Sequence, residues 1–184
     1  MSIKHIEVGV CGLSCKLCPM YHTQAASRCY GCKSSGRMAV GCPFITCAVK
    51  NKKIEFCWQC SGKDACEKWK KHREAGKQHD SFKCYQKLET DIKEIERNGI
   101  EEFEKQQKLR EDCLKLMLVE YNEGRSKSYY CIAVTVLSLK ELLETMKKAK
   151  EQSEGFQLDE KSKVMHSILE QIAQNKGYYL KLRK

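Results

Sequence analysis

The feature that most constrains this 184-residue chain is its cysteine array, because ten of its thirteen cysteines lie between Cys11 and Cys66. A C-x2-C pair places two sulfur atoms on one tight turn, where both can bind the same metal ion or cluster. Such a density of pairs predicts a polypeptide segment held together by metal. Three pairs have this spacing: Cys15/Cys18, Cys29/Cys32 and Cys57/Cys60.

All ten cysteines of the segment are candidate metal ligands: Cys11, Cys15, Cys18, Cys29, Cys32, Cys42, Cys47, Cys57, Cys60 and Cys66. Zinc is the favoured cofactor, since structural zinc sites take four thiolates and ten cysteines fill two such sites with two left over. A third site would need Cys84 and one of His22, His72 or His79. The sequence leaves open which pairs share a metal, and both interleaved and sequential arrangements are compatible with it.

An iron–sulfur cluster is the alternative cofactor. The run from Cys11 to Cys18 reads C-x3-C-x2-C, the spacing that radical S-adenosylmethionine enzymes use around their cluster, and Cys18 and Cys42 precede prolines as in bacterial ferredoxins. Those radical enzymes build a large α/β barrel, and this chain lacks the alternation of strands and helices that a barrel needs. The alternative is therefore a cluster protein with a redox or electron-transfer role.

Other uses of the thiols fit less well. A disulfide framework needs an oxidising compartment, whereas residues 1–10 lack an apolar run of signal-peptide length and thirteen is an odd number. Cys113 and Cys131 lie in apolar helical stretches and are expected to be isolated thiols in the core. That interpretation does not fit the ten cysteines of the array. A catalytic thiol needs a depressed pKa and a neighbouring base, and no cysteine is singled out in that way. We expect a binding protein rather than an enzyme.

The formal charge of +10 suggests nucleic acid at first sight. Each tetrathiolate zinc site contributes about −2, so two sites lower the charge to about +6 and three to about +4. A protein partner is therefore favoured, and a nucleic-acid-binding zinc protein, with the basic run 68–73 as its contact, is a further alternative. No run of about 20 apolar residues exists, so we expect no contact with a membrane and a soluble, cytoplasmic protein.

The predicted fold is mainly α, with an irregular cysteine-rich metal-binding lobe at residues 1–82 and a helical lobe at residues 83–184, either separate or packed as one unit. The first 63 residues are rich in turn signals and have no helical period. A small α+β fold is the alternative, because residues 178–184 read as a short strand.

Helices are expected where periodicity and caps agree. A stripe of Leu88, Ile92 and Ile95 is followed by Asn98-Gly99, and Ser138 with Glu141 forms a capping box. The expected helices are 64–75 with a capping box of Asp64 and Glu67 and an end at Gly76, then 88–98, 103–121, 129–137, a segment from 138, and a last helix that Asp159 caps and that stops at Asn175 and Gly177.

Two smaller features have ordinary interpretations. The run Gly124–Ser128 precedes a helix and could hold an anion, but Ser128 acting as a helix cap is favoured because the complete phosphate-loop pattern is absent. Trp58 and Trp69 stand beside candidate ligands, so we expect them to shield metal sulfurs from water rather than to stack on nucleobases.

Taken together, the cysteine motifs resemble an uncharacterised bacterial and archaeal family called domain of unknown function 3795. The resemblance runs from about Val8 to about Gln107, and the segments 121–131 and 179–183 look like longer members. It implies metal binding through the cysteines and carries no established reaction. The residues that carry it are Cys11-Gly-Leu-Ser-Cys-Lys-Leu-Cys-Pro19, Cys29-Tyr-Gly-Cys32, the step from Cys42 to Cys47, Glu55-Phe-Cys-Trp-Gln-Cys60 and Cys66-Glu67-Lys68.

Overall fold

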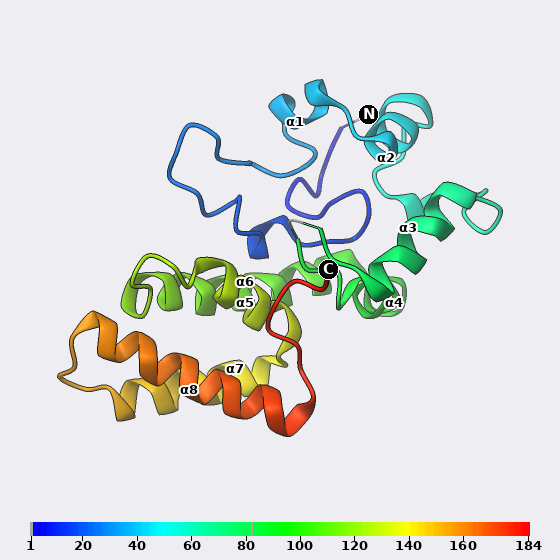
Figure 1. Ribbon diagram of the computed structural model, residues 1–184. Helices are drawn as coiled ribbons and strands as arrows, with labels where there is room; N and C mark the ends of the chain where they lie inside the picture. Colours follow the sequence, from blue (N-terminus) through cyan, green and yellow to red (C-terminus); the bar gives the residue numbers. More distant parts are fainter. Residues whose placement is uncertain (1, 82) are drawn as a thin grey trace.

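A computed structural model describes residues 2–81 and 83–184 of the chain, and its fold is mainly α, as the sequence predicts. Figure 1 shows α5 and α6 as a central layer, with the hairpin of α7 and α8 on one side and the cysteine-rich segment on the other. The helices of the second half are α4 (Leu88–Asn98), α5 (Ile100–Glu120), α6 (Lys127–Val136), α7 (Leu139–Gln152) and α8 (Leu158–Lys176).

The helix boundaries follow local chemistry. The apolar stripe of α4 is buried, and Gly99 separates α4 from α5 with a φ of 87°, a conformation that favours glycine. The predicted capping box before α7 is present: Ser138 Oγ accepts from the Glu141 N–H, and Glu141 accepts from the Ser138 N–H at 2.8 Å. The prediction for α8 is wrong at its start, because Gln157 rather than Asp159 is the N-cap.

The main core lies between α5, α6, α7 and α8. It contains fully buried side chains from each of them, including Leu114, Tyr130, Leu142 and Met165. Leu17 from the cysteine-rich segment belongs to the same core. Hydrophobic burial therefore joins the two halves of the chain directly, through apolar contact that does not depend on metal.

The first half consists of short pieces: η1 (Cys15–Leu17), α1 (Ser35–Val40), α2 (Pro43–Ile45), a π-helical turn η2 (Thr46–Asn51), η3 (Cys57–Gln59) and α3 (Glu67–Gln78). The β pairing in this half, among the residues that the structure describes, is one isolated antiparallel bridge between Val8 and Ser14. Val8 and Phe56 pack on Ile95 and Phe103, so this segment also rests on α4 and α5.

The start and end of α3 differ from the prediction. Its N-cap is Cys66, not Asp64, and the helix continues past Gly76 to Gln78. Gly76 is needed for a close approach, because a Cβ there would lie 3.3 Å from Leu88 Cδ2. Gly76 therefore allows α3 and α4 to pack closely. The prediction that Gly76 ends the helix is wrong.

The C-terminal segment after α8 runs back across the helices toward α4 (red in Figure 1) and forms no strand among the described residues, contrary to the strand that the sequence suggested. Arg183 secures it. Its backbone N–H donates to the Asp80 carboxylate at 2.8 Å, and its guanidinium donates to Asp80 and to the carbonyl of Gly76. No helix in the described part of the chain is long and apolar enough to span a bilayer.

Candidate metal centre

The turn at Cys57 and Cys60 presents two thiols from one 3-10 helix. The Cys60 N–H donates to the Cys57 carbonyl at 3.2 Å, which closes the turn. The side-chain carbonyl of Gln59 accepts from the backbone N–H groups of Glu55 and Phe56, at 3.2 and 3.1 Å. Hydrogen bonds therefore fix the backbone that leads into the turn, and this fixes the positions from which the two thiols project.

Cys47 on η2 and Cys66 at the start of α3 meet this turn around one small cavity. The cavity has a volume of about 30 Å³, and Trp69 and Phe44 form its apolar wall. That volume holds one or two water-sized particles. Four thiols from three separate elements thus line one small space: Cys47, Cys57, Cys60 and Cys66, called here the second cysteine set.

The charges around the second set are unequal. Burial, together with the neighbouring thiols of Cys11, Cys47 and Cys66, raises the pKa of Cys57 to about 12. The ammonium of Lys52 lies 2.9 Å from Cys60 Sγ, and this hydrogen bond lowers the pKa of the Cys60 thiol. Because the thiolate rather than the thiol binds metal, a metal ion that bound here would have to displace the proton of Cys57, whereas the Cys60 thiol loses its proton more easily.

A second gathering forms where the N-terminal loop folds back on itself. The Gly9 N–H donates to the Leu13 carbonyl at 2.8 Å, which turns the chain around Cys11. A Cβ at Gly9 would lie 3.5 Å from the sulfur atoms of both Cys11 and Cys32. Gly9 therefore leaves open the space between two thiols that are 21 positions apart in the sequence.

Cys15 and Cys32 are in direct contact. The Cys32 thiol donates a hydrogen bond to Cys15 and lowers the pKa of the Cys15 thiol, while the same contact raises the pKa of Cys32. Gly31 permits the approach, with a φ of 99° and with its Cβ position 3.6 Å from Cys15 Sγ. We call Cys11, Cys15, Cys18 and Cys32 the first cysteine set.

Lys83 stands beside the first set. Its burial alone would lower the pKa of its ammonium, but the four cysteines of that set together raise it above the usual value. The first set therefore influences Lys83 and, through Cys15 and Cys32, Lys33, whereas the second set influences Lys52. Both places are centres of negative charge once a thiol loses its proton.

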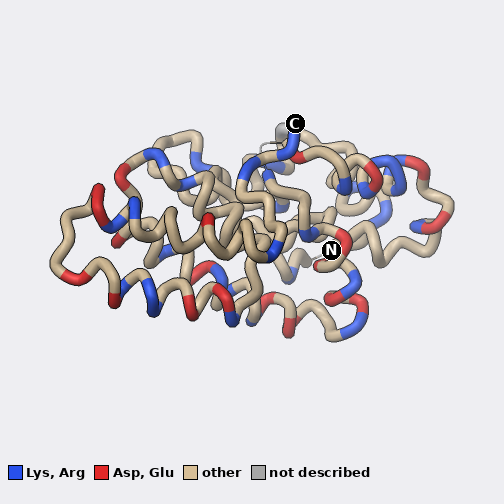
Figure 2. The backbone as a smooth tube through the Cα atoms, turned by 60° about the horizontal axis from the view of Figure 1, so that its bottom comes forward, with Lys and Arg blue, Asp and Glu red and all other residues tan. Residues whose placement is uncertain are grey.

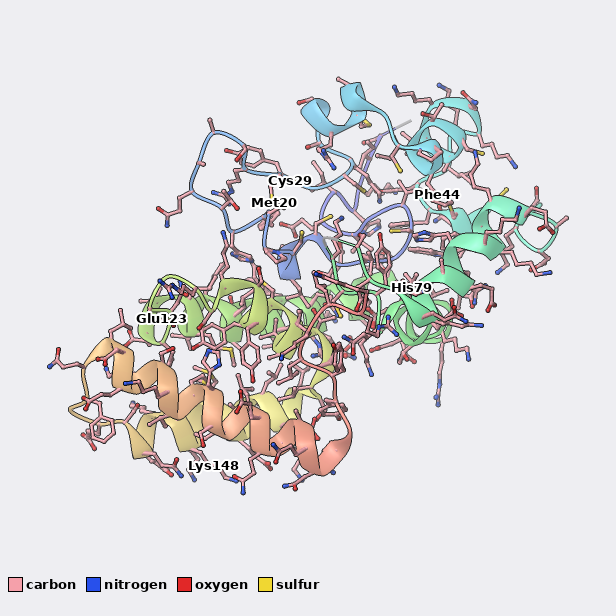
Figure 3. All side chains as sticks on the ribbon, viewed as in Figure 1. Met20, Cys29, Phe44, His79, Glu123 and Lys148 are labelled. Carbon is pink, nitrogen blue, oxygen red and sulfur yellow. The ribbon has the colours of Figure 1, made fainter. Side chains whose placement is uncertain are left out.

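Two candidate ligands stand apart from these sets. Cys29 lies on the outer loop, where its N–H donates to the Met20 carbonyl at 3.0 Å, and Figure 3 shows the two residues next to each other. Cys42 is the N-cap of α2, and its influence on Cys11 is a minor one. Among residues 2–81 and 83–184, no three or more His, Cys, Asp or Glu side chains are placed so that they could hold a metal ion.

The remaining candidates have other surroundings. His22 Nε2 lies 2.5 Å from the Lys16 carbonyl, and His72 packs against Phe44 and Trp69. Cys84, whose pKa burial raises to about 11, lines a separate cavity. Cys113 and Cys131 are buried in α5 and α6, which agrees with their interpretation as core thiols.

Of the two tryptophans, Trp69 has the expected position beside the thiols. It is 4 % exposed and forms part of the wall of the second set's cavity. Trp58 stacks on Phe56 with ring centroids 4.3 Å apart, and its Cζ3 atom closes over Gly12. Trp58 thus contributes mainly to packing against α4.

A polar cluster at the start of α6 is a feature that the sequence did not reveal. Ser126 Oγ lies 2.8 Å from a Glu123 carboxylate oxygen and 2.6 Å from His166 Nε2, and Ser162 also donates to Glu123. The single hydroxyl proton of Ser126 goes to the carboxylate, so His166 must donate to Ser126. The histidine is not the base of a nucleophilic serine, and the cluster ties α8 to the loop before α6.

The same cluster corrects the expectation for residues 124–128. The N-cap of α6 is Ser126, not Ser128. Glu123 accepts from the N–H of Arg125 at 3.3 Å and from the Ser126 hydroxyl, so a carboxylate of the chain itself already pairs with these donors before α6. The anion-binding alternative is not supported.

Residues 7–71 match a family described as protein of unknown function (DUF3795). The similarity to this family is confined to that segment. All ten cysteines of the array lie within the matched DUF3795 segment, which ends before the resemblance was expected to end at Gln107. No curated protein and no solved structure matches the chain.

Proposed function

We propose that this protein binds zinc through its N-terminal cysteines, and that the metal organises an interaction or regulatory module. The single observation that carries the proposal is the convergence of Cys47, Cys57, Cys60 and Cys66, from three separate elements, on one small cavity. Four thiolates are the ligand set of closed structural zinc sites. In this proposal each of the two cysteine sets binds one zinc ion, and Cys29 and Cys42 are not ligands.

The size of the cavity favours one ion over a cluster. A space of about 30 Å³ is of the size of one ion, for which the four thiols would have to move closer together, whereas a four-iron cluster adds eight metal and sulfide atoms. The apolar wall formed by Trp69 and Phe44 would exclude water from the metal–sulfur bonds. Lys52 would offset part of the net charge of about −2 that a tetrathiolate zinc site carries.

The charge distribution gives no support to the nucleic-acid alternative. Figure 2 shows Lys and Arg interspersed with Asp and Glu along most of the chain. Within the basic run of α3, Arg73 is already engaged in a bidentate ion pair with Glu89, at 2.7 and 2.5 Å. Nucleic-acid binding relies on many available phosphate contacts, so a protein partner is the stronger proposal.

Metal analysis of anaerobically purified protein tests the proposal. We expect colourless protein with about two zinc ions per chain and no acid-labile sulfide. Replacing both Cys57 and Cys60 by serine should remove about one zinc ion, and replacing Cys11 and Cys15 should remove the other. Cys113→Ser, in the helical core, is the matched control and should leave the zinc content unchanged.

Two results would overturn the proposal. Brown protein that contains iron and sulfide would establish the cluster alternative. A zinc content that does not respond to the loss of Cys57 and Cys60 would show that the second cysteine set is not a metal site.

A further inference from the structure

A larger cavity, of about 290 Å³, lies where the cysteine-rich segment meets the helices. It is separate from the small cavity of the second cysteine set, and although Cys18 of the first set and Lys83 also line it, most of its wall is apolar. Large apolar side chains from three parts of the chain contribute to that wall: Leu13, Leu17, Met20, Ile132 and Leu182. At this volume it falls at the small end of ligand pockets.

Gln107 of α5 lines this cavity with an unusual side chain. The residue is 6 % exposed, yet its amide makes no hydrogen bond to any residue that the structure describes. Its amide is not fully enclosed, and Gln107 lines the cavity, so a molecule in the cavity can reach it. An amide that is nearly buried and has no hydrogen bond to a described residue can be completed by a ligand or by water.

Arg110 lies one turn further along α5, on the same side of the helix. Its Nη1 atom donates to the carbonyls of Val134 and Leu137, at 2.7 and 2.5 Å, which fixes the guanidinium at the end of α6. The other guanidinium nitrogens make no hydrogen bond to a described residue. Arg110 thus offers donors in a fixed orientation on the cavity wall.

Asp91 of α4 brings the opposite charge to the same cavity. Its carboxylate accepts no hydrogen bond from any described residue, and Arg110 is the charged group that affects it most strongly. Asp91 in turn is the charged group that most affects Arg110. The cavity therefore combines an acceptor carboxylate, a donor guanidinium and an amide that can do both, beside a largely apolar space.

We propose that this cavity binds a free α-amino acid with an apolar side chain. The ligand ammonium group lies at Asp91, its carboxylate lies at Arg110 and Gln107, and its side chain lies among Leu17, Met20 and Ile132. A zwitterion satisfies the Asp91 carboxylate, the remaining donors of Arg110 and the Gln107 amide at once, which neither a simple carboxylic acid nor a simple amine does. The small volume excludes nucleotides and larger cofactors.

Calorimetry on the metal-loaded full chain tests this assignment with L-leucine and L-methionine as probes. We expect saturable binding of at least one of them. 4-Methylpentanoate and 3-methylbutylamine, which are leucine without its ammonium and without its carboxylate, should each bind roughly tenfold more weakly or worse, because one charge-assisted contact is lost.

Two variants test the residues. Asp91→Asn and Gln107→Leu should each weaken amino-acid binding roughly tenfold. Gln171→Leu on the exposed side of α8 and Asp112→Asn on the surface of α5 are the matched controls and should bind as the unaltered chain does. Thermal unfolding of each variant verifies that it is folded, and the two truncated ligands test the same contacts without any mutation.

Three results would overturn the proposal. The first is the absence of binding by both amino acids. The second is equal binding of leucine and either truncated ligand. The third is binding that both Asp91→Asn and Gln107→Leu leave unchanged. Zinc content measured on the same samples separates these outcomes from a failure of the metal sites, since neither Asp91 nor Gln107 belongs to a cysteine set.

Discussion

The ammonium of Lys33 lies 3.0 Å from the carboxylate of Glu55, and Lys33 is only 1 % exposed. The ammonium also donates to the His5 carbonyl at 3.1 Å and lies 3.6 Å from the centre of the Phe56 ring. Glu55 in addition accepts from the backbone N–H groups of Lys4 and His5. The pair thus joins the N-terminal strand-like segment, the Cys29/Cys32 loop and the turn before Cys57.

Lys33→Met should destabilise the protein by about 3–5 kcal/mol, because it leaves the Glu55 carboxylate buried without its cation. Urea unfolding measures the change. Lys105→Met is the control, since Lys105 forms an exposed pair with Glu102 and should change stability by about 0.5 kcal/mol or less. Equal effects of the two substitutions would mean that the Lys33–Glu55 pair has no special structural role.

Lys33 also illustrates what the sequence could not reveal. Lysine is almost never fully buried without a partner, and here the partner lies 22 positions away, with no local pattern that links the two. By contrast, α4 could be predicted to the residue, because its apolar stripe and Gly99 are local signals. Local sequence signals predicted most of the helices from α4 onward. The conformation of the first half depends instead on contacts between residues far apart in the sequence.

The candidate site shows the same division. The sequence identified the cysteines of the array but not their grouping, because Cys11 and Cys32 meet through loop geometry around Gly9. Gln107 and Arg110 could be placed on one helix face, but no sequence pattern revealed that they face a cavity. Such contacts depend on three-dimensional packing that periodicity alone does not encode.

Glu123 should make stability depend on pH in the acid range. Burial alone would raise the pKa of its carboxyl, but hydrogen bonds from Ser162 and Ser126 lower it to about 2. The stabilisation is therefore present above the unfolded-state pKa of about 4.5 and is lost as the pH falls toward 2. Comparing Glu123→Gln with the unaltered chain by urea unfolding at several pH values should give a difference that shrinks across this window.

The control for Glu123 is Glu154→Gln, because Glu154 makes no hydrogen bond to a described residue. It should behave like the unaltered chain at every pH. A Glu123→Gln difference that is constant from pH 6 to pH 3 would contradict the assigned hydrogen bonds, since the linkage requires the difference to follow protonation.

Removal of metal should unfold residues 1–75 more than the C-terminal helices. The first half has small separate apolar clusters, whereas α5, α6, α7 and α8 share one large core that needs no metal. Hydrogen exchange measured by mass spectrometry, before and after a chelator, checks this expectation. Equal loss of protection in both halves would contradict this expectation and would mean that the metal stabilises the whole chain as one unit.

Asp91→Asn should stabilise the free protein, and more so at high pH. Burial raises the pKa of the Asp91 carboxyl to about 7, although Arg110 opposes this, whereas the unfolded value is near 3.8. Below about pH 4 both states are protonated and the carboxyl costs nothing. As the pH rises toward 7 the unfolded state loses its proton first, so the stability that protonated Asp91 provides is lost.

The expected gain from Asp91→Asn is near zero at pH 4 and on the order of 2–4 kcal/mol above pH 7, from the size of the pKa change. Urea unfolding across this range, without added amino acid, measures it, and Asp112→Asn, an exposed carboxylate, should show no comparable trend. A gain that does not vary with pH would place the Asp91 carboxylate in contact with water rather than in the cavity. A gain that grows with pH means that the free protein keeps a destabilising carboxylate there, which is the expected cost of a group retained to bind a ligand.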